Sequence, residues 1–461
     1  MSSLKNIVNR HRNSGKTFRR IRMRCHLNAD KLYARIRTDF DMVPDHRASN
    51  SSIAMTDALL SGFAMFCLKD PSLLAFEKRK QEEPESLHEV FGISRIPSDT
   101  QMRTILDPLD VRTIRRPFKT IFAQLQRGKV LEKMTWLGGY HLLALDGTGI
   151  YTSEKMGSAY CLRKRKRNGK EEYYQQMFAG AFVHPERSEV IPTCPEMIVK
   201  QDGIKKNDCE RNAAKRYLAD FRREHPHLKT IVIEDGLASN APHIRELEKH
   251  DLRYILGVTP NDHEYLFQLV DEAAASGEIS EFHLPDPDNP EVHHCFRFLN
   301  NVPLNKSSED SLRVNFLEYW ETDNAGNIRN RFSWVTDISI SRDNAYEIMR
   351  AGRSRWRIEN EAFNTLKNQG YNLEHNYGLG KQHLSAVFAH LLMLAFLVDQ
   401  VQELCCPLFQ AARAKCGTKR YLWERIRGFF SEYIAPSMEV ILHYIVHGIP
   451  KNRKRIEAPW D

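Results

Sequence analysis

The chain has 461 residues, of which 41% are hydrophobic and 27% are charged, and its 67 Lys and Arg against 59 Asp and Glu give a net charge of +8. This composition excludes a disordered tail, a short peptide and a disulfide-stapled mini-protein, and the length predicts about two to four domains. The 9 cysteines form no CxxC pair, so we expect free thiols in a cytoplasmic protein and no zinc ribbon.

Neither a signal sequence nor a membrane span is expected. The first residues carry charges but no apolar stretch behind them, which is unlike a secretory signal. The longest apolar run, residues 386–398, is shorter than the roughly 20 residues that cross a membrane. We therefore expect this run to form a buried core helix and the protein to have no membrane partner.

Positive charge is concentrated in two segments. Residues 1–24 carry eight Lys or Arg and no Asp or Glu, so they account for the whole net charge. The second segment contains Arg163, Lys164, Arg165, Lys166, Arg167 and Lys170. Either segment alone would fit a solvated arm or a charged loop. Together they favour a polyanionic partner with a defined track, since each neutralised phosphate releases counterions.

Helices are expected before residue 130. Residues 51–68 have an apolar helical pattern opened by Ser51 or Ser52, which are good N-cap residues. Residues 86–106 are typical of helix, turn and helix, with Gly92 ending the first helix. This shape fits a helix-turn-helix DNA reader and also an ordinary helical hairpin.

From about residue 137 the chain alternates between strands and helices. Residues 141–147 and 230–236 are continuously apolar up to an acidic residue, as in interior strands that are covered on both faces. Residues 209–224 indicate a helix between them, and this alternation predicts an α/β core. Residues 258–340 are rich in strand-like segments and are expected to form a β-rich insertion, after which a helical pattern runs from about 343 to 368.

Two acidic residues stand at the ends of the predicted interior strands. Asp146 and Asp235 each end an apolar strand and are each followed by glycine. A carboxylate at the end of a strand is held in direction by the backbone, which suits a site for divalent cations that need converging oxygens. The alternative for either residue alone is an Asp-Gly turn that closes a hairpin.

A third carboxylate is expected from the helical segment near residue 359. Glu359 and Glu361 lie about 200° apart at 100° per residue, so they cannot both face one site. Because Glu359 shares its stripe with Trp356 and Phe363, we expect it to face a largely apolar surface, where a carboxylate is costly unless it is paired or binds a metal. Glu359 is therefore our candidate. Two roles fit Arg355 equally well. In the first it contacts a phosphate or the Glu359 carboxylate as part of the site. In the second it forms only an ordinary i,i+4 ion pair with Glu359.

With these residues in place, the chain resembles the DDE transposases of the IS4-like group, enzymes of bacterial insertion sequences with an RNase H-like core. The resemblance rests on Asp146 in LALDGTG, Asp235 in VIEDG and Glu359 in RWRIE, in this order and with the long gap before the glutamate. It covers residues 141–400, and the stretches LLSGFAMF and PSDTQMR also resemble the N-terminal region of the group.

The chain departs from the group's pattern around the glutamate. The group has a Tyr three residues before the Arg and a Lys seven residues after the Glu, whereas this chain has Gly352 and Leu366 at these positions. Lys367 follows one position later, and a one-residue insertion after Glu359 would bring it into register. The resemblance implies phosphate-binding roles for Arg355 and Lys367. These roles depend on how this chain's departures at Gly352 and Leu366 are accommodated.

The resemblance implies an α/β fold, in which a mixed sheet with flanking helices carries a β-rich insertion and follows an α-helical N-terminal region. It implies two Mg2+ ions, or Mn2+, held by Asp146, Asp235 and Glu359, and a two-metal cleavage and strand transfer of DNA. The expected parts are a helical, basic DNA-binding region over 1–130, a catalytic core over 131–257 and 341–400, the insertion over 258–340 and a helical C-terminal region over 401–461.

The implied partners are DNA, as terminal inverted repeats and target, and a second copy of the chain in a synaptic complex. The basic segment Arg163 to Lys170 would contact the DNA backbone, in a nucleoid-associated bacterial protein. Trp320 and Trp334 fit stacking on an unpaired base, and they also fit a position in the core. Three other functions stay open: a non-cutting, repressor-like relative, a metal-dependent nuclease without strand transfer, and a metal hydrolase of another polyanion.

Overall fold

The parallel pairing of the two predicted interior strands organises the fold. The protein is described here by a computed structural model, over residues 26–82, 84–198, 209–286, 289–306 and 312–448. Strand β2 (Tyr140–Ser153) pairs in parallel with β7 (Thr230–Glu234), which pairs in parallel with β8 (Arg253–Gly257). On the other side of β2, β4 (Glu171–His184) pairs in the antiparallel direction. All five residues of β7 are buried, as expected of an interior strand.

One sheet continues from this core into the insertion, in the order β3-β4-β2-β7-β8-β12-β11-β10-β9. The short strands β1, β5 and β6 pair off this path, β1 with β2 and the other two with β4. The remaining strands are β1 (Thr135–Trp136), β3 (Leu162–Arg165), β5 (Arg187–Pro192), β6 (Glu196–Ile198), β9 (Ser280–Pro285), β10 (Val292–Pro303), β11 (Arg313–Asp323) and β12 (Ile328–Thr336).

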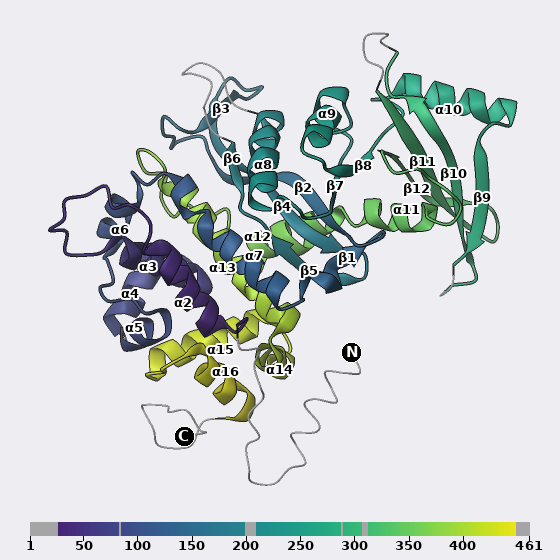
Figure 1. Ribbon diagram of the computed structural model, residues 1–461. Coiled ribbons are helices and arrows are strands. Elements are labelled where there is room, and N and C mark those ends of the chain that lie inside the picture. Colours follow the sequence, from purple (N-terminus) through teal and green to yellow (C-terminus); the bar gives the residue numbers. More distant parts are fainter. Residues whose placement is uncertain (1–25, 83, 199–208, 287–288, 307–311, 449–461) are drawn as a thin grey trace, which may run out of the picture.

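The segment predicted to be rich in strands forms the antiparallel β9–β12 and one helix, α10 (Glu264–Ser276). Its strand β12 pairs with β8 from Thr336 opposite Ile255 to Trp334 opposite Gly257. The strands therefore extend the core sheet, and they lie on the right of Figure 1 with α10 behind them.

Helices cover both faces of the core sheet. Helix α8 (Glu210–Glu224) and α9 (Ala241–Lys249) lie on one face, where a Cβ at Gly180 of β4 would meet the Tyr217 hydroxyl of α8. Helix α11 (Ala345–Arg353), a π-helical turn (Ile358–Phe363) and α12 (Asn364–Asn368) follow the insertion and lie on the other face (Figure 1). The expectation of a mixed sheet with flanking helices, as in an RNase H-like core, is confirmed.

The helices before and after the core pack together in one body. They are α2 (Ala29–Phe40), α3 (Met55–Cys67), α4 (Leu73–Glu82), α5 (Glu85–Phe91), α6 (Asp99–Leu106), α7 (Arg116–Arg127), α13 (Leu384–Cys405), α14 (Pro407–Cys416), α15 (Lys419–Glu432) and α16 (Met438–His447). The Asp30 carboxylate of α2 accepts the backbone N–H groups of Met438 and Glu439 at 2.7 and 3.0 Å. The two ends of the described chain thus share one helical body, with the purple and yellow helices side by side in Figure 1.

Helix α13 is the centre of this body. It is the one helix of the described chain that is long and apolar enough to cross a membrane by length and composition, but 94% of its most apolar window is buried inside the protein. It contacts α3 and α7 and also β5 of the sheet. The expected buried core helix is therefore confirmed, and it is longer than the apolar run suggested.

The predicted helix boundaries need two corrections. Helix α3 begins at Met55 after Ala54, so neither Ser51 nor Ser52 caps it. The helical pattern predicted over 343–368 is not one helix, because it breaks after Arg353 and resumes as the π-helical turn. The predicted helix, turn and helix over 86–106 is confirmed, with Gly92 in the left-handed conformation at the end of α5.

Candidate active site

Asp146 and Asp235 lie at matching positions of two neighbouring parallel strands. The register pairs Ala144 of β2 with Ile233 of β7, so the residues two positions further on, Asp146 and Asp235, stand at the same level. Asp235 directly follows the last residue of β7, as predicted, but Asp146 does not end its strand, because β2 continues to Ser153 along β4. The parallel pairing of β2 with β7 ends at Ala144, so both aspartates lie at the carboxyl edge of the parallel part of the sheet, where sites form in open α/β sheets. The structure thus brings together two aspartates that are far apart in the sequence.

The environment of Asp146 is that of a partly buried carboxylate among charges of both signs. Burial raises the pKa of Asp146 to about 6, the Arg355 guanidinium and the Gly147 N–H lower this pKa, and the Glu359 and Asp235 carboxylates raise it. The side chain keeps 23% of its surface exposed. Both other predicted acids therefore act electrostatically on Asp146.

Arg355 lies between two of these carboxylates. Its Nη2 lies 2.6 Å from Oε1 of Glu359, and its Nη1 lies 3.5 Å from Oδ2 of Asp146. The i,i+4 pair with Glu359 that the sequence left open is present, and the same guanidinium also reaches the core strand. Arg355 thus joins the helical segment to β2.

The reason given for choosing Glu359 was wrong. Its side chain does not face an apolar surface: it is 48% exposed, and the neighbouring Trp356 is 42% exposed. Phe363 and Leu366 of the same predicted stripe are buried. Glu359 differs from Glu361 because it contacts the same guanidinium as Asp146, that of Arg355. Glu361 instead lies near Arg357, which donates to the carbonyl oxygen of Pro185.

The turn that carries Glu359 is wider than an α-helical turn. The backbone N–H of Asn364 donates to the carbonyl oxygen of Glu359, five residues before it, where an α-helix uses four. Such a turn holds one additional residue and is common at functional sites. The additional residue lies where a one-residue insertion after Glu359 was expected. Lys367 pairs with Glu374 at 2.8 Å.

The carboxylates are of the chemical kind that binds a divalent metal, but their present spacing does not form a metal site. Carboxylate oxygens of Asp146, Asp235 and Glu359 are the hard ligands that Mg2+ prefers. Within the described ranges, however, no three His, Cys, Asp or Glu side chains lie close enough together to hold a metal ion. The positive charge between Asp146 and Glu359 is supplied by Arg355 in this arrangement.

Two open cavities meet at Asp235. One, of about 550 Å³, is lined on the α8 side by Asp146, Glu210, Glu234 and His243. A Cβ on Gly147 would lie 2.3 Å from the Glu210 carboxylate, so a side chain at this position would require the Glu210 carboxylate to move. Sequence reasoning missed Glu210, Glu234 and His243; the only signal was Glu234 directly before Asp235 in VIEDG.

Glu234 and His243 form a buried ion pair in this cavity, with 2.6 Å between Oε2 and Nε2. Burial lowers the pKa of His243, but the Glu234 carboxylate outweighs this effect and the pKa is raised. The Glu234 carboxylate is thus directed toward His243 of α9.

The second cavity, of about 580 Å³, lies between the core and the insertion. It is lined by Asp235, Arg355 and aromatic residues that include Phe332, Trp334 and Trp356. Trp334 is 5% exposed and occupies the space above Gly352, where a Cβ would lie 2.5 Å from its indole nitrogen. The sequence left open whether Trp334 stacks on a base or lies in the core, and the structure places it in the core. The exposed rings here are Trp356 and Phe332, and Phe332 stacks on Trp334 with 5.9 Å between the ring centroids.

Trp320 is half-buried on β11, opposite Arg331 of β12. It does not line either cavity at Asp235.

The predicted basic segment forms the β3–β4 hairpin, away from the carboxylates along β4. Arg163, Lys164 and Arg165 lie on β3, and Lys166, Arg167 and Lys170 lie in or beside its turn. The other basic segment, residues 1–24, lies outside the described residues.

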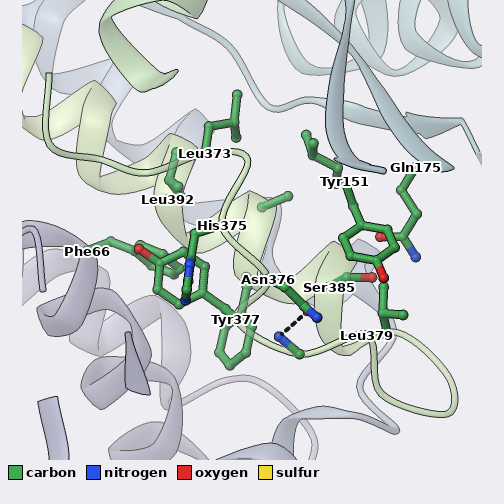
Figure 2. Close-up of a pocket in the computed structure, with 14 residues that line it drawn as sticks. Phe66, Tyr151, Gln175, Leu373, His375, Asn376, Tyr377, Leu379, Ser385 and Leu392 are labelled. Atoms are coloured by element: carbon green, nitrogen blue, oxygen red, sulfur yellow. Dashed lines mark hydrogen bonds between the residues drawn. The ribbon is translucent and has the colours of Figure 1, made fainter. Parts of the chain in front are cut away.

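A third cavity lies away from the site, at the seam between the helical body and the core. Figure 2 shows Phe66 of α3, Tyr151 of β2 and Leu392 of α13 around the loop that contains His375 and Tyr377. The cavity holds about 30 Å³ and is mostly apolar. It has the character of a packing gap and contributes nothing to the acidic site.

The mixed sheet with flanking helices carries one aspartate on β2, a second directly after β7, and a glutamate on a later helical segment that Arg355 links to the first aspartate. This arrangement is typical of the DDE class of RNase H-like proteins. The family model for the transposase DDE domain matches residues 137–397. This is more than half of the chain, and the chain belongs to this family. No curated protein matches it.

Proposed function

We propose that this chain is a transposase of the IS4-like group, which cleaves the ends of a bacterial insertion sequence and joins them to target DNA. The observation that carries the proposal is that Asp146 and Asp235 stand at the same level of two parallel-paired strands, while Arg355 contacts both Asp146 and Glu359. Membership of the transposase DDE family supports DNA as the substrate.

Asp146, Asp235 and Glu359 would hold two Mg2+ ions, or Mn2+, once Arg355 turns away from the carboxylates. The bound metal would supply an activated water or 3′-hydroxyl and stabilisation of the leaving oxygen. The residues of this chain would position the phosphate: Asp146 between the other two acids, Arg355 released toward the phosphate, and Lys367 on the same side of the helix. Phosphoryl transfer of this kind depends on positioning and charge rather than on a protein base.

The proposal includes partners and location. The region 1–130, which we propose as the DNA-binding part, would recognise terminal repeats, while 131–257 and 341–400 would cut and 258–340 would contact the DNA near the cleavage point. The C-terminal region 401–461, whose described helices pack against the described N-terminal helices, would contribute to dimerisation. Two ends cut in concert would need a homodimer in a synaptic complex. Such a protein would act in the cytoplasm, on the nucleoid.

The test is a strand-transfer assay with a DNA end that already carries a free 3′-hydroxyl. A transposase should join this end to target DNA in the presence of Mg2+. Hydrolysis without joining would instead favour a metal-dependent nuclease. The variant Asp146→Ala should still bind end DNA but neither cut nor join it; a variant that cuts normally would remove Asp146 from the site.

A further inference from the structure

The indole nitrogen of Trp334 lies against the backbone of Gly352, in the wall of the cavity between the core and the insertion. A Cβ on Gly352 would lie 2.5 Å from Nε1 of Trp334 and 2.6 Å from Cε2, so a side chain at position 352 would require the indole to move. Both residues line the cavity, where α11 packs beside β8 and β11 (Figure 1). The indole thus occupies the space that a side chain at position 352 would take.

The N–H of this indole has no acceptor within the described ranges of the protein. The Trp334 side chain is buried, and a buried indole usually finds a hydrogen-bond partner. Trp136, for comparison, donates its Nε1–H to the carbonyl oxygen of Glu347 at 3.0 Å. Among the described residues nothing accepts from Nε1 of Trp334, and this atom is open to the cavity rather than enclosed by protein. An unpaired donor in a buried side chain is costly, so it indicates an acceptor that the chain itself does not supply.

Trp334 stands in the same row of the sheet as the two aspartates. It lies opposite Gly257 of β8, and the register of β8 with β7 places Gly257 level with Asp235. Asp235 is in turn level with Asp146. Because residues that are level in neighbouring strands point to the same face, the indole lies on the face of the sheet where Arg355 meets Asp146.

The charged groups around the indole already have partners. Three arginines line the cavity, and each has a carboxylate at 2.6 Å: Arg331 pairs with Glu318, Arg353 with Glu321 and Arg355 with Glu359. Three carboxylates line the cavity as well, those of Glu234, Asp235 and Glu318, so its wall is not basic overall. The indole differs from the arginines because it is uncharged and no carboxylate has to release it before it can bind a ligand.

A phosphate oxygen complements a single N–H donor. Such an oxygen accepts hydrogen bonds and donates none, whereas the edge of a base presents donors as well. Neighbouring strands lie about 4.8 Å apart, so three strand spacings, about 14 Å, separate the backbone of Trp334 from that of Asp146. Phosphates along one DNA strand recur about every 3.4 Å of helix axis. A phosphate at the indole would therefore lie within about four nucleotides of one at Asp146.

We propose that the Nε1–H of Trp334 donates a hydrogen bond to a phosphate oxygen of the DNA strand that is cleaved at Asp146, within about four nucleotides of the cleaved phosphate. Gly352 serves this contact, because its missing side chain leaves room for the indole. The inference rests on the proposed function and refines it, since it assigns a backbone contact to a buried aromatic residue of the insertion rather than to a basic segment.

The test replaces the indole N–H by sulfur. Benzothienylalanine in place of Trp334 keeps the shape of the fused rings and removes the donor, and the same replacement of Trp320, which does not line the cavity, is the matched control. Binding of a duplex that carries the mapped cleavage site is measured without metal ion, so that the DNA stays uncut. Loss of a hydrogen bond to a charged acceptor should weaken binding by the Trp334 variant about tenfold, and the Trp320 variant should bind as the unmodified chain does.

Thermal unfolding and salt dependence separate a hydrogen bond from a structural role. The sulfur variant at Trp334 should melt as the unmodified chain does, because its shape is kept, and it should keep the slope of log K against log salt, because the N–H carries no charge. The ordinary substitution Trp334→Phe should weaken binding as well, but it should also melt at a lower temperature, since the smaller ring leaves a gap.

Two results would overturn the inference. One is unchanged binding by the sulfur variant at Trp334, and the other is an equal loss of binding in the Trp334 and Trp320 variants. In either case an unmodified chain that binds, cuts and joins DNA leaves the proposed function in place. If the unmodified chain does not bind the duplex, the proposed function falls together with the inference.

The acceptor is identified on duplexes that carry a neutral methylphosphonate at single positions, counted from the mapped cleavage site. At the contacted phosphate the losses from the methylphosphonate and from the sulfur replacement of Trp334 should not add, because either change weakens the same hydrogen bond. This phosphate should lie within about four nucleotides of the cleaved one. Additive losses at every position would show that the N–H binds a base edge instead, and this would contradict the phosphate contact.

Discussion

The guanidinium of Arg355 reaches Asp146 across 209 positions of sequence, with 3.5 Å between Nη1 and Oδ2. Through its second contact, with Glu359, it replaces repulsion between two carboxylates by attraction. The acidic site is thus arranged around a cation of the protein itself, which a metal ion would have to displace.

The pH dependence of cleavage should respond to this arginine. Because Arg355 lowers the pKa of Asp146, Arg355→Gln should raise that pKa, and ionisation of the carboxylate then requires a higher pH. We expect the pH at which nicking reaches half of its plateau to move upward. Arg357→Gln, whose guanidinium bonds to the carbonyl of Pro185, is the matched control and should leave that pH in place. Equal profiles for all three proteins would contradict the assigned contact.

The ionised carboxylate of Asp146 should lower the free energy of unfolding near neutral pH. Its pKa is about 6 in the folded chain and 3.8 ordinarily, so the folded state binds this proton more tightly. Its stabilising effect is complete below the unfolded pKa and is lost as the pH rises through the folded pKa. Asp146→Asn should therefore raise the free energy of unfolding by about 1–2 kcal/mol at neutral pH, after screening by solvent.

Urea unfolding without metal, at pH 7.5 and pH 4, measures this effect. The gain for Asp146→Asn should be small at pH 4, where Asp146 is mostly protonated in the folded chain. Asp343→Asn, which changes an exposed carboxylate, should have little effect at either pH. A loss of stability for Asp146→Asn at neutral pH would show that the carboxylate is not held in an unfavourable environment.

The two glutamates of the π-helical turn should differ in activity. Glu359→Gln should reduce nicking by about a hundredfold or more, because carboxylates at such a site act through charge. Glu361→Gln keeps the Arg355 contacts and should remain active. Gel assays of nicking on end DNA, with circular dichroism to verify folding, separate the variants; an inactive Glu361→Gln beside an active Glu359→Gln would reverse the assignment.

Asp107 should be important for stability although it lies far from the acids. Its carboxylate accepts the backbone N–H groups of Lys381, Gln382 and Leu384 at 2.8, 2.9 and 3.1 Å, and so caps the start of α13 from the end of α6. Asp107→Ala should lower stability by about 1–3 kcal/mol. Glu424→Ala, which breaks the exposed pair with Arg420, should change it by less than about 1 kcal/mol. Denaturant titration that finds the two variants equal would argue against the cap.

The parts of the fold that depend on neighbouring residues in the chain could be predicted from the sequence. The two interior strands, the position of Asp235 after β7 and the turn at Gly92 follow from apolar runs and local backbone preferences. The continuation of β2 beyond Asp146 to Ser153 does not, because it depends on pairing with β4. The burial of the apolar run in α13 follows as well, because its length and composition leave little choice other than a core.

Other features depended on backbone detail that a regular pattern does not contain. The stripe assigned to Glu359 assumed 100° per residue, and the π-helical turn changes that angle just where the glutamate lies. Helix α3 begins without either expected serine cap, because burial of its whole length outweighs the capping preference.

Charge was the property that the sequence represented least well. The sequence determined that Arg163 to Lys170 is basic, and that an acidic residue follows each of two apolar runs. Only the tertiary structure decided that Glu154 and Glu172 cancel the lysines and that Arg355 lies between Asp146 and Glu359. The physical reason is that electrostatic energy depends on distances in space, whereas the order of residues fixes only distances along the chain.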